Sequence, residues 1–398
     1  MVFSILILCI SYACIKNIYL KQFLPSPIEY VIPSTVYSIN LDSDEEIKFD
    51  TKSQCKIICG SDTMSGHTHF RGGYSSRFSK HSYAIKFDKK HSIAGQPEDK
   101  DFILNASFVD KTFIRHKLSF DLFRMMSPIN KAPICTYAEL YANGQYDGLY
   151  VVMQKMDAST LGVVKADSST VIFKEPPLFY EKEIIPQDSS NYYQQTFPKK
   201  KKQDRTYQAE TLRSFILLAD DSTFNNNVSD IFDLSNIADW HILLLLTNNS
   251  DGILKNFFLY KCNDSTPYRI AIWDYDHSFG RDGDGEYNML SRNVDVNRNQ
   301  LINRLMRIPE YRQLIDRRWN ELRKNGIISS ESIIRLINAN ASVIREAAKR
   351  DSKIWPINDS DFFNDTDFDQ ELSIMRDFVT LNVQRLDRYF ANINAASD

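Results

Sequence analysis

Three polar residues in the second half of the chain have types and a spacing that suit phosphoryl-transfer chemistry. Asp251 and Asn256 lie five residues apart in T-N-N-S-D-G-I-L-K-N, and Asp274 follows in W-D-Y-D-H-S-F-G. In phosphoryl transfer, an aspartate at the first position orients or deprotonates the acceptor hydroxyl, while the asparagine and the second aspartate hold metal ions. Asp-Gly and Asn-Asp pairs also occur in ordinary turns, so the motif alone leaves both interpretations open.

The segments that flank these residues predict a β-hairpin. Phe257 to Lys261 and Arg269 to Trp273 are rich in aromatic and apolar residues, and a cluster of turn-forming residues separates them. In an antiparallel pair, the residue before the first strand lies beside the residue after the second strand. We therefore expect Asn256 and Asp274 to meet at the open end of this hairpin.

A buried helix is predicted immediately before Asp251. The sequence from Leu234 to Asn248 is almost continuously apolar in its second half and ends in polar Thr-Asn-Asn. Polar residues at both ends are typical of a helix that begins and stops within this range. Asp251 is then expected on the loop that joins the helix to the hairpin.

A second candidate segment lies near the N-terminus and could face a nucleotide. Tyr83-Ala84-Ile85-Lys86 differs by one residue from the V-A-I-K sequence that carries a phosphate-binding lysine on a strand. Alternation along the strand puts Ser82, Ala84 and Lys86 on one face, with space beside the two small residues. The alternative is an exposed lysine near the end of a strand.

The loop before this strand contains two glycines and two arginines, in H-F-R-G-G-Y-S-S-R. Glycines allow the backbone to approach a ligand closely, and Arg71 or Arg77 could pair with phosphate oxygens. A lysine in this role needs a carboxylate partner. Asp121 and Glu139 are both candidates for Lys86, and the sequence does not choose between them.

The composition is that of a globular protein. The 398 residues are 43% hydrophobic and 12% aromatic, which is enough for one large bilobal domain or two ordinary domains. A net charge of -3 gives no general attraction for nucleic acid. The basic run from Lys199 to Lys202 is interpreted as a solvated loop.

The N-terminal segment predicts export. Residues 2–15 are mostly apolar, which is the length of a signal-peptide core and short for a membrane span. Ala13-Cys14 is faintly similar to a lipoprotein cleavage site. Cysteine usage does not settle the compartment, because Cys55 and Cys59 would lie about 13 Å apart on one strand, beyond disulfide reach.

The remaining pattern divides the chain into a β-rich first part and a helical second part. Strands are expected between residues 30 and 87, a helix over 110–126 and a hairpin over 134–154. Residues 175–207 are rich in Pro, Lys, Gln, Ser and Tyr and predict a surface insertion. From residue 299 onwards the pattern is helical.

Taken together, the motifs resemble the spore coat protein H (CotH) kinase family. The matching blocks, in order, are R-G-G-Y-S-S-R-F-S-K-H-S-Y-A-I-K-F, L-N-A-S-F-V-D-K-T-F-I-R-H-K-L-S-F-D-L, A-E-L-Y-A-N-G-Q-Y-D-G-L-Y-V-V-M-Q-K, N-S-D-G-I-L-K-N-F-F-L-Y and W-D-Y-D-H-S-F-G. The resemblance implies an α+β, atypical protein-kinase-like bilobal fold with a β-rich N-lobe and a mainly helical C-lobe. The expected divisions are a signal peptide or lipoprotein/membrane anchor over 1–22, the N-lobe over 30–155 and the C-lobe over 156–398, with the insertion near 175–207.

The resemblance also implies an activity: transfer of the γ-phosphoryl group of ATP to Ser/Thr hydroxyls of a protein substrate, with Mg²⁺ or Mn²⁺. It implies a secreted or cell-surface lipoprotein, tethered to the membrane through its N-terminus, in a bacterium. The alternative is a catalytically idle surface adhesin or scaffold that uses the same fold.

Roles for individual residues follow from the matching blocks. Catalysis and nucleotide binding would be divided among residues that contact phosphates, the acceptor hydroxyl, metal ions or adenine. The expected roles are Lys86 and Arg71 at the phosphates, Asp251 at the acceptor hydroxyl or a metal ion, Asn256 and Asp274 as metal ligands, Asp276 as a further metal partner, and Met153, Gln154 and Lys155 as the hinge beside adenine.

Overall fold

The computed structural model describes residues 34–165, 167–180, 192–281, 294–356 and 366–394. The predicted signal peptide or anchor at residues 1–22 lies outside these ranges. Within them, no helix combines the length and the apolar character needed to cross a membrane.

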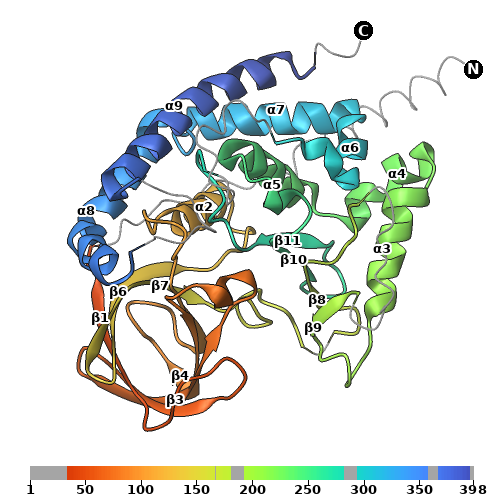
Figure 1. Ribbon diagram of the computed structural model, residues 1–398. Helices are drawn as coiled ribbons and strands as arrows, with labels where there is room; N and C mark the ends of the chain where they lie inside the picture. The colour runs from red at the N-terminus through yellow and green to blue at the C-terminus, as the bar shows by residue number, and fades with distance from the viewer. Residues whose placement is uncertain (1–33, 166, 181–191, 282–293, 357–365, 395–398) are drawn as a thin grey trace, which may run out of the picture.

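A closed barrel of seven strands forms the first part of the molecule, at the lower left of Figure 1. Its strand order is β1-β2-β3-β4-β5-β7-β6, and a parallel pairing of β1 with β6 closes it. The strands are β1 (Tyr37–Asp42), β2 (Ser53–Cys59), β3 (Asp62–Arg71), β4 (Ser82–His91), β5 (Asp99–Asn105), β6 (Cys135–Ala142) and β7 (Gln145–Gln154). Alternate side chains fill the interior, among them Ile57, Ile85 and Leu104. Closure leaves no unpaired sheet edge along the barrel wall.

Helix α2 (Arg115–Met126) follows the barrel strand β5 and is almost entirely buried. The sequence predicted a helix from residue 110, but the helix begins at Arg115. The reason is local: the Asp110 carboxylate accepts hydrogen bonds from the backbone N–H groups of Thr112 and Arg115, and Phe113 has a φ of 57°. These bonds stabilise a turn in place of the first helical turn.

The predicted hairpin is confirmed and belongs to a four-stranded sheet of order β11-β10-β8-β9. Phe257 pairs with Ile272 at its open end. The strands are β8 (Val171–Lys174), β9 (Gln194–Phe197), β10 (Phe257–Lys261) and β11 (Arg269–Ile272), with β9 inside the segment predicted as an insertion. Residues 181–191 of that segment lie outside the described ranges.

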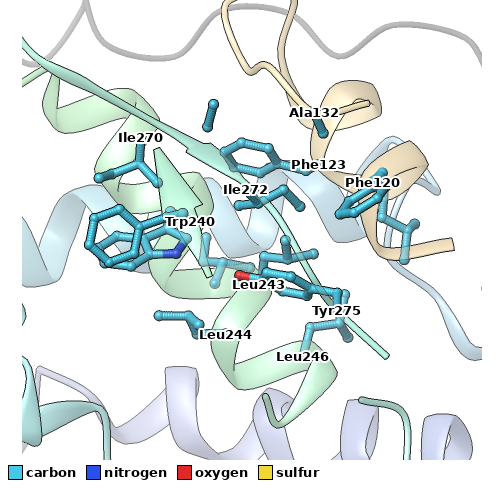
Figure 2. Packing of buried hydrophobic residues seen from close by; sticks show 14 of the residues in the cluster. Phe120, Phe123, Ala132, Trp240, Leu243, Leu244, Leu246, Ile270, Ile272 and Tyr275 are labelled. Atoms are coloured by element: carbon cyan, nitrogen blue, oxygen red, sulfur yellow. The ribbon is translucent and has the colours of Figure 1, made fainter. Parts of the chain in front are cut away.

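Helix α5 (Leu234–Thr247) lies against this sheet and is buried along its whole length, as its sequence predicted. Figure 2 shows Trp240 and Leu243 of α5 packed with Ile272 of β11 and with Phe120 and Phe123 of α2. Burial of side chains of this size contributes about 1.5–3 kcal/mol each. The hairpin and α2 are thus fixed to one common core.

The remaining helices surround this core. They are α3 (Thr206–Leu218), α4 (Asp221–Ile231), α6 (Gln300–Met306), α7 (Pro309–Lys324), α8 (Ser330–Ile354) and α9 (Phe368–Asn392). Short 3-10 turns occupy Tyr74–Arg77, Asp251–Ile253 and Val296–Arg298. Helix α8 packs against β7 of the barrel and against α9, and α9 also contacts α5. Figure 1 shows α8 and α9 together at the left, above the barrel. The predicted α+β composition is confirmed, with a barrel of strands preceding a mainly helical part.

Candidate functional site

The open end of the β10–β11 hairpin brings Asn256 and Asp274 together. The Asn256 amide nitrogen donates a hydrogen bond to the Asp274 carbonyl oxygen at 2.9 Å, and the Trp273 N–H donates to the Asn256 carbonyl oxygen at 3.0 Å. Both Asn256 and Asp274 have a left-handed backbone, with φ values of 61° and 58°. Asn and Asp adopt this conformation more readily than other residues with a side chain, and such positions cluster at functional sites. The Asn256 side-chain oxygen is the atom that could coordinate a metal ion.

Asp251 opens the 3-10 turn that follows α5. One of its carboxylate oxygens lies 3.0 Å from the Lys255 Nζ and 3.8 Å from the His277 Nδ1. The turn lies close to α5, since a Cβ on Gly252 would come within 2.9 Å of the Leu244 side chain. His277 belongs to the loop that begins at Asp274, so Asp251 faces that loop directly.

Asp274, Asp276 and His116 form a cluster in which one potential ligand atom from each residue lies within 4.8 Å of the others. Burial and then the neighbouring Asp276 raise the pKa of Asp274 above its usual value. Burial alone would also raise the pKa of Asp276, but His277, His116 and backbone N–H groups lower it. Two carboxylates this close repel each other, and a bound cation would relieve the repulsion.

The donor set fits a hard divalent cation. Asp274 and Asp276 offer carboxylate oxygens and Asn256 offers an amide oxygen, all at the end of one hairpin. Mg²⁺ and Mn²⁺ prefer oxygen ligands and commonly use one or two carboxylates together with phosphate oxygens. The cluster could therefore hold Mg²⁺ or Mn²⁺ together with a phosphate chain.

Arg71 supplies positive charge beside this cluster. It is the last residue of β3, and its guanidinium carbon lies 5.7 Å from the centroid of the Trp273 ring. Burial lowers the pKa of Arg71 from its usual value, and the nearby Asp274 opposes this effect. A guanidinium stacked on an aromatic ring keeps its N–H groups available at the edge, where they can pair with phosphate oxygens.

Lys86 is placed differently from Arg71. The β3–β4 register pairs Arg71 with Ser82, so Lys86 lies four residues farther along β4, about 13 Å away along the strand. Its side chain is exposed and faces outward like Ser82 and Ala84, as the sequence predicted. Both acids proposed as its partner are engaged elsewhere: Asp121 pairs with Lys117 and Arg124, and Glu139 pairs with Arg350 and Tyr146.

The predicted hinge lies at the end of β7. Met153 is buried in the core shared with α2 and α5, and the Gln154 side-chain oxygen accepts a hydrogen bond from the Ile134 N–H. Lys155 Nζ lies 3.3 Å from Asp101, which is the register partner of Lys86. The structure thus brings Arg71, Asp251, Asn256, Asp274 and Asp276 together and puts Lys86 near Lys155 instead. The adenine role of the hinge stays a prediction.

Three residues at the site were not singled out from the sequence. Lys255 and His277 both contact Asp251 and lie inside the motifs that were recognised. Their charged or titratable side chains could therefore have been identified as site residues from the sequence. His116 also lies inside a matching block, but nothing in the sequence connects that block to the hairpin, because α2 is far from the hairpin in the chain.

The loop that carries Asp274 and Asp276 is anchored by a buried ion network. Arg115, at the start of α2, donates to the Ser278 carbonyl oxygen at 2.9 Å and pairs with Asp110 at 2.6 Å. It also contacts Glu371 of α9 at 2.9 Å, and Glu371 in turn binds Arg281. The later part of the loop, at Ser278 and Arg281, is therefore tied to helices α2 and α9.

A barrel joined to a helical part, with a loop of clustered carboxylates beside it, is an arrangement that could hold a divalent cation. The family model described as CotH kinase protein matches residues 68–386, and the chain belongs to that family. It is also similar to inner spore coat protein H of Bacillus subtilis (strain 168), with 24% identity over 221 residues. This match covers 54% of the present chain and 59% of the length of that relative.

Proposed function

We propose that this protein is an ATP- and divalent-metal-dependent protein kinase that phosphorylates Ser/Thr hydroxyls. The observation that carries the proposal is the meeting of Asn256 and Asp274 at the hairpin end, with Asp251 facing the same loop. Family membership supports the same conclusion at the level of a kinase-like protein. The proposal includes a kinase-like arrangement, in which the barrel corresponds to the N-lobe and the helical part to the C-lobe.

Each side chain would contribute one physical effect. Bound ATP with its metal ion would supply the γ-phosphoryl group. Asp274, Asp276 and Asn256 would hold the metal, and Arg71 would neutralise phosphate charge at the barrel side. Asp251 would orient the acceptor hydroxyl and accept its proton. Lys255, 3.0 Å from Asp251, would keep that carboxylate in place and would add positive charge near the transferred group.

The test is incorporation of label from γ-labelled ATP into a Ser-rich acceptor protein, with Mn²⁺ or Mg²⁺. We expect Asp251→Asn and Asp274→Asn each to lower the rate by about 10²-fold or more, since each removes a group that acts on the reacting atoms or the metal. Asp230→Asn, on the exposed surface of α4, is the matched control and should retain the wild-type rate.

Two outcomes would contradict the proposal. Label incorporation that both Asp251→Asn and Asp274→Asn leave unchanged would place the chemistry elsewhere. Tight ATP binding by the wild type without any transfer, over a range of acceptors, would favour the idle adhesin or scaffold. The protein acceptor, export from the cytoplasm and the membrane tether stay predictions, and fractionation of the source cells tests the last two.

A further inference from the structure

His116 lies at the base of the carboxylate cluster and faces it from α2. The residue is 2% exposed and occupies the first turn of the helix. Its Nδ1 accepts a hydrogen bond from the backbone N–H of Tyr275 at 2.9 Å, and its Nε2 lies 3.7 Å from an Asp274 carboxylate oxygen. At first sight these distances make His116 a third metal ligand beside Asp274 and Asp276.

The hydrogen bond from Tyr275 argues against that role. A backbone N–H can only donate, so the Nδ1 that faces it carries no proton. A neutral imidazole then has its proton on Nε2, the nitrogen that faces Asp274. A protonated ring nitrogen has no lone pair for a metal ion. Rotation of the ring to free Nε2 would leave the buried N–H of Tyr275 unpaired.

We propose that His116 is a positioning residue that directs its Nε2–H toward Asp274, and that oxygen atoms alone hold the metal. This inference rests on the proposed metal-dependent function. The 3.7 Å separation is longer than a hydrogen bond, so this contact requires the two side chains to move closer when the metal binds. A donor at this position fixes which carboxylate oxygen turns toward the metal, as partners of metal ligands commonly do.

The surroundings hold the imidazole in this orientation. Its ring stacks on Phe120, one turn along α2, with centroids 5.7 Å apart and an interplanar angle of 26°. The preceding residue, Arg115, is fixed by Asp110, Glu371 and the Ser278 carbonyl oxygen. His116 thus lies next to the buried ion network that supports the metal-binding loop, and its Nε2 faces Asp274.

A role of His116 as a metal ligand and a role as a positioning residue predict different metal preferences of the site. A site with a histidine ligand gains affinity for Zn²⁺, Ni²⁺ and Cu²⁺, whereas a site of carboxylate and amide oxygens suits Mg²⁺ and Mn²⁺. A positioning histidine should also be replaceable by another group that has an acceptor and a donor side by side. The amide of glutamine is such a group, whereas phenylalanine fills a similar space without either.

The experiment measures Mn²⁺ by electron paramagnetic resonance in protein labelled with ¹⁵N-histidine, with a non-hydrolysable ATP analogue present. We expect no coupling from a directly bonded nitrogen of His116. We also expect the Mn²⁺ dissociation constant to rise about tenfold in His116→Phe and to return most of the way in His116→Gln. Circular dichroism and thermal unfolding of both variants show whether the fold is retained.

A directly bonded histidine nitrogen that disappears in His116→Gln would overturn the inference, as would the absence of saturable Mn²⁺ binding in the wild type. Equal Mn²⁺ affinity in the wild type and His116→Phe would overturn it too. A nitrogen coupling that persists unchanged in His116→Gln comes from another histidine and agrees with the inference. Mn²⁺ binding is measured without phosphoryl transfer, so failure of the kinase proposal and failure of this inference give separate results.

Discussion

Two cations on neighbouring strands were candidates for contact with phosphate, and the structure separates them. Arg71 lies over Trp273 and beside Asp274, whereas Lys86 is exposed four residues farther along β4. Because about 13 Å of strand separates the two positions, both side chains could reach the same phosphate oxygen only if each extended toward the other. Arg71 is the cation nearer to the carboxylate cluster.

Substitution of Arg71 should therefore weaken ATP binding more than substitution of Lys86. We expect Arg71→Gln to raise the KM for ATP about ten- to a hundredfold, because a hydrogen bond to a charged group contributes roughly 1.5–3 kcal/mol. The measurement is initial rate against ATP concentration for both variants, with ATP-analogue binding as a second readout. A loss confined to Lys86→Gln would show that the lysine makes the phosphate contact instead.

The sequence could predict the Asn256–Asp274 contact because local rules determine it. Strand composition and a turn fix the hairpin, and the hairpin fixes its own open end. The contact of His116 with Asp274 has no such local origin. It depends on how α2 packs against α5 and β11, which is a property of the shared core around Phe120 and not of any spacing in the chain.

At the scale of elements, helix α9 is part of the support of the loop that carries Asp274 and Asp276. Glu371 is completely buried and binds both Arg115 and Arg281. Burial alone would raise the pKa of Glu371, but the two arginines outweigh it and lower the pKa from 4.5 to about 2. The same packing brings Phe378 of α9 within 2.9 Å of where a Cβ on Gly280 would lie.

Glu371→Gln should destabilise the protein in a pH-dependent way. Because the folded-state pKa is lowered, the stabilisation is fully present above the unfolded-state pKa near 4.5 and is lost as pH falls toward 2. We expect a loss of about 3–5 kcal/mol at pH 7, since the variant leaves buried arginine charge under-compensated. The difference from wild type should shrink as the pH falls below 4.5.

Urea unfolding at several pH values tests this prediction. Asp377→Asn, an exposed position on the same helix, is the control and should stay within about 0.5 kcal/mol of wild type. A Glu371→Gln deficit that is constant from pH 7 to pH 3 would contradict the ionic origin of the effect.

The boundaries of elements show where sequence patterns stop being informative. The apolar spacing from residue 110 onward predicted a helix, but the Asp110 carboxylate accepts a hydrogen bond from the Arg115 N–H, and the helix begins only at Arg115. The hydrogen-bonding preference of one aspartate outweighed periodicity. By contrast, the continuous apolar run of α5 gave the helix to within one residue, because a fully buried helix leaves little choice of conformation at its centre.

At the scale of the whole molecule, α8 joins the barrel to the helical part through a buried lysine. Lys80 Nζ donates to the carbonyl oxygens of Ala106 and Leu149 and pairs with Asp351 of α8 at 2.7 Å. The backbone of β7 also approaches the Asp351 side chain closely. A Cβ on Gly148 would come within 2.2 Å of the Asp351 carboxylate, so only glycine fits there.

Asp351→Ala should therefore destabilise the whole protein, because it leaves the Lys80 charge buried without its carboxylate. A loss of about 3–5 kcal/mol is expected in urea unfolding, with faster amide exchange in both β7 and α8. Arg350→Ala is the matched control, since its pair with Glu139 is partly exposed and should cost less than about 1 kcal/mol. Equal effects of the two substitutions would contradict this account.

The position of Glu371 has a consequence for how relatives are sorted into active and inactive proteins. A proteolytic cut or a frameshift after α8 would remove Glu371 and leave Asp251, Asn256 and Asp274 intact. Such a shortened chain would still contain the motifs around Asp251, Asn256 and Asp274, yet the loop that carries Asp274 and Asp276 would have lost one of its two anchors. Inspection of those motifs alone would not detect the loss. The integrity of the last helix is thus a separate criterion, and it can be checked from sequence without knowledge of the substrate.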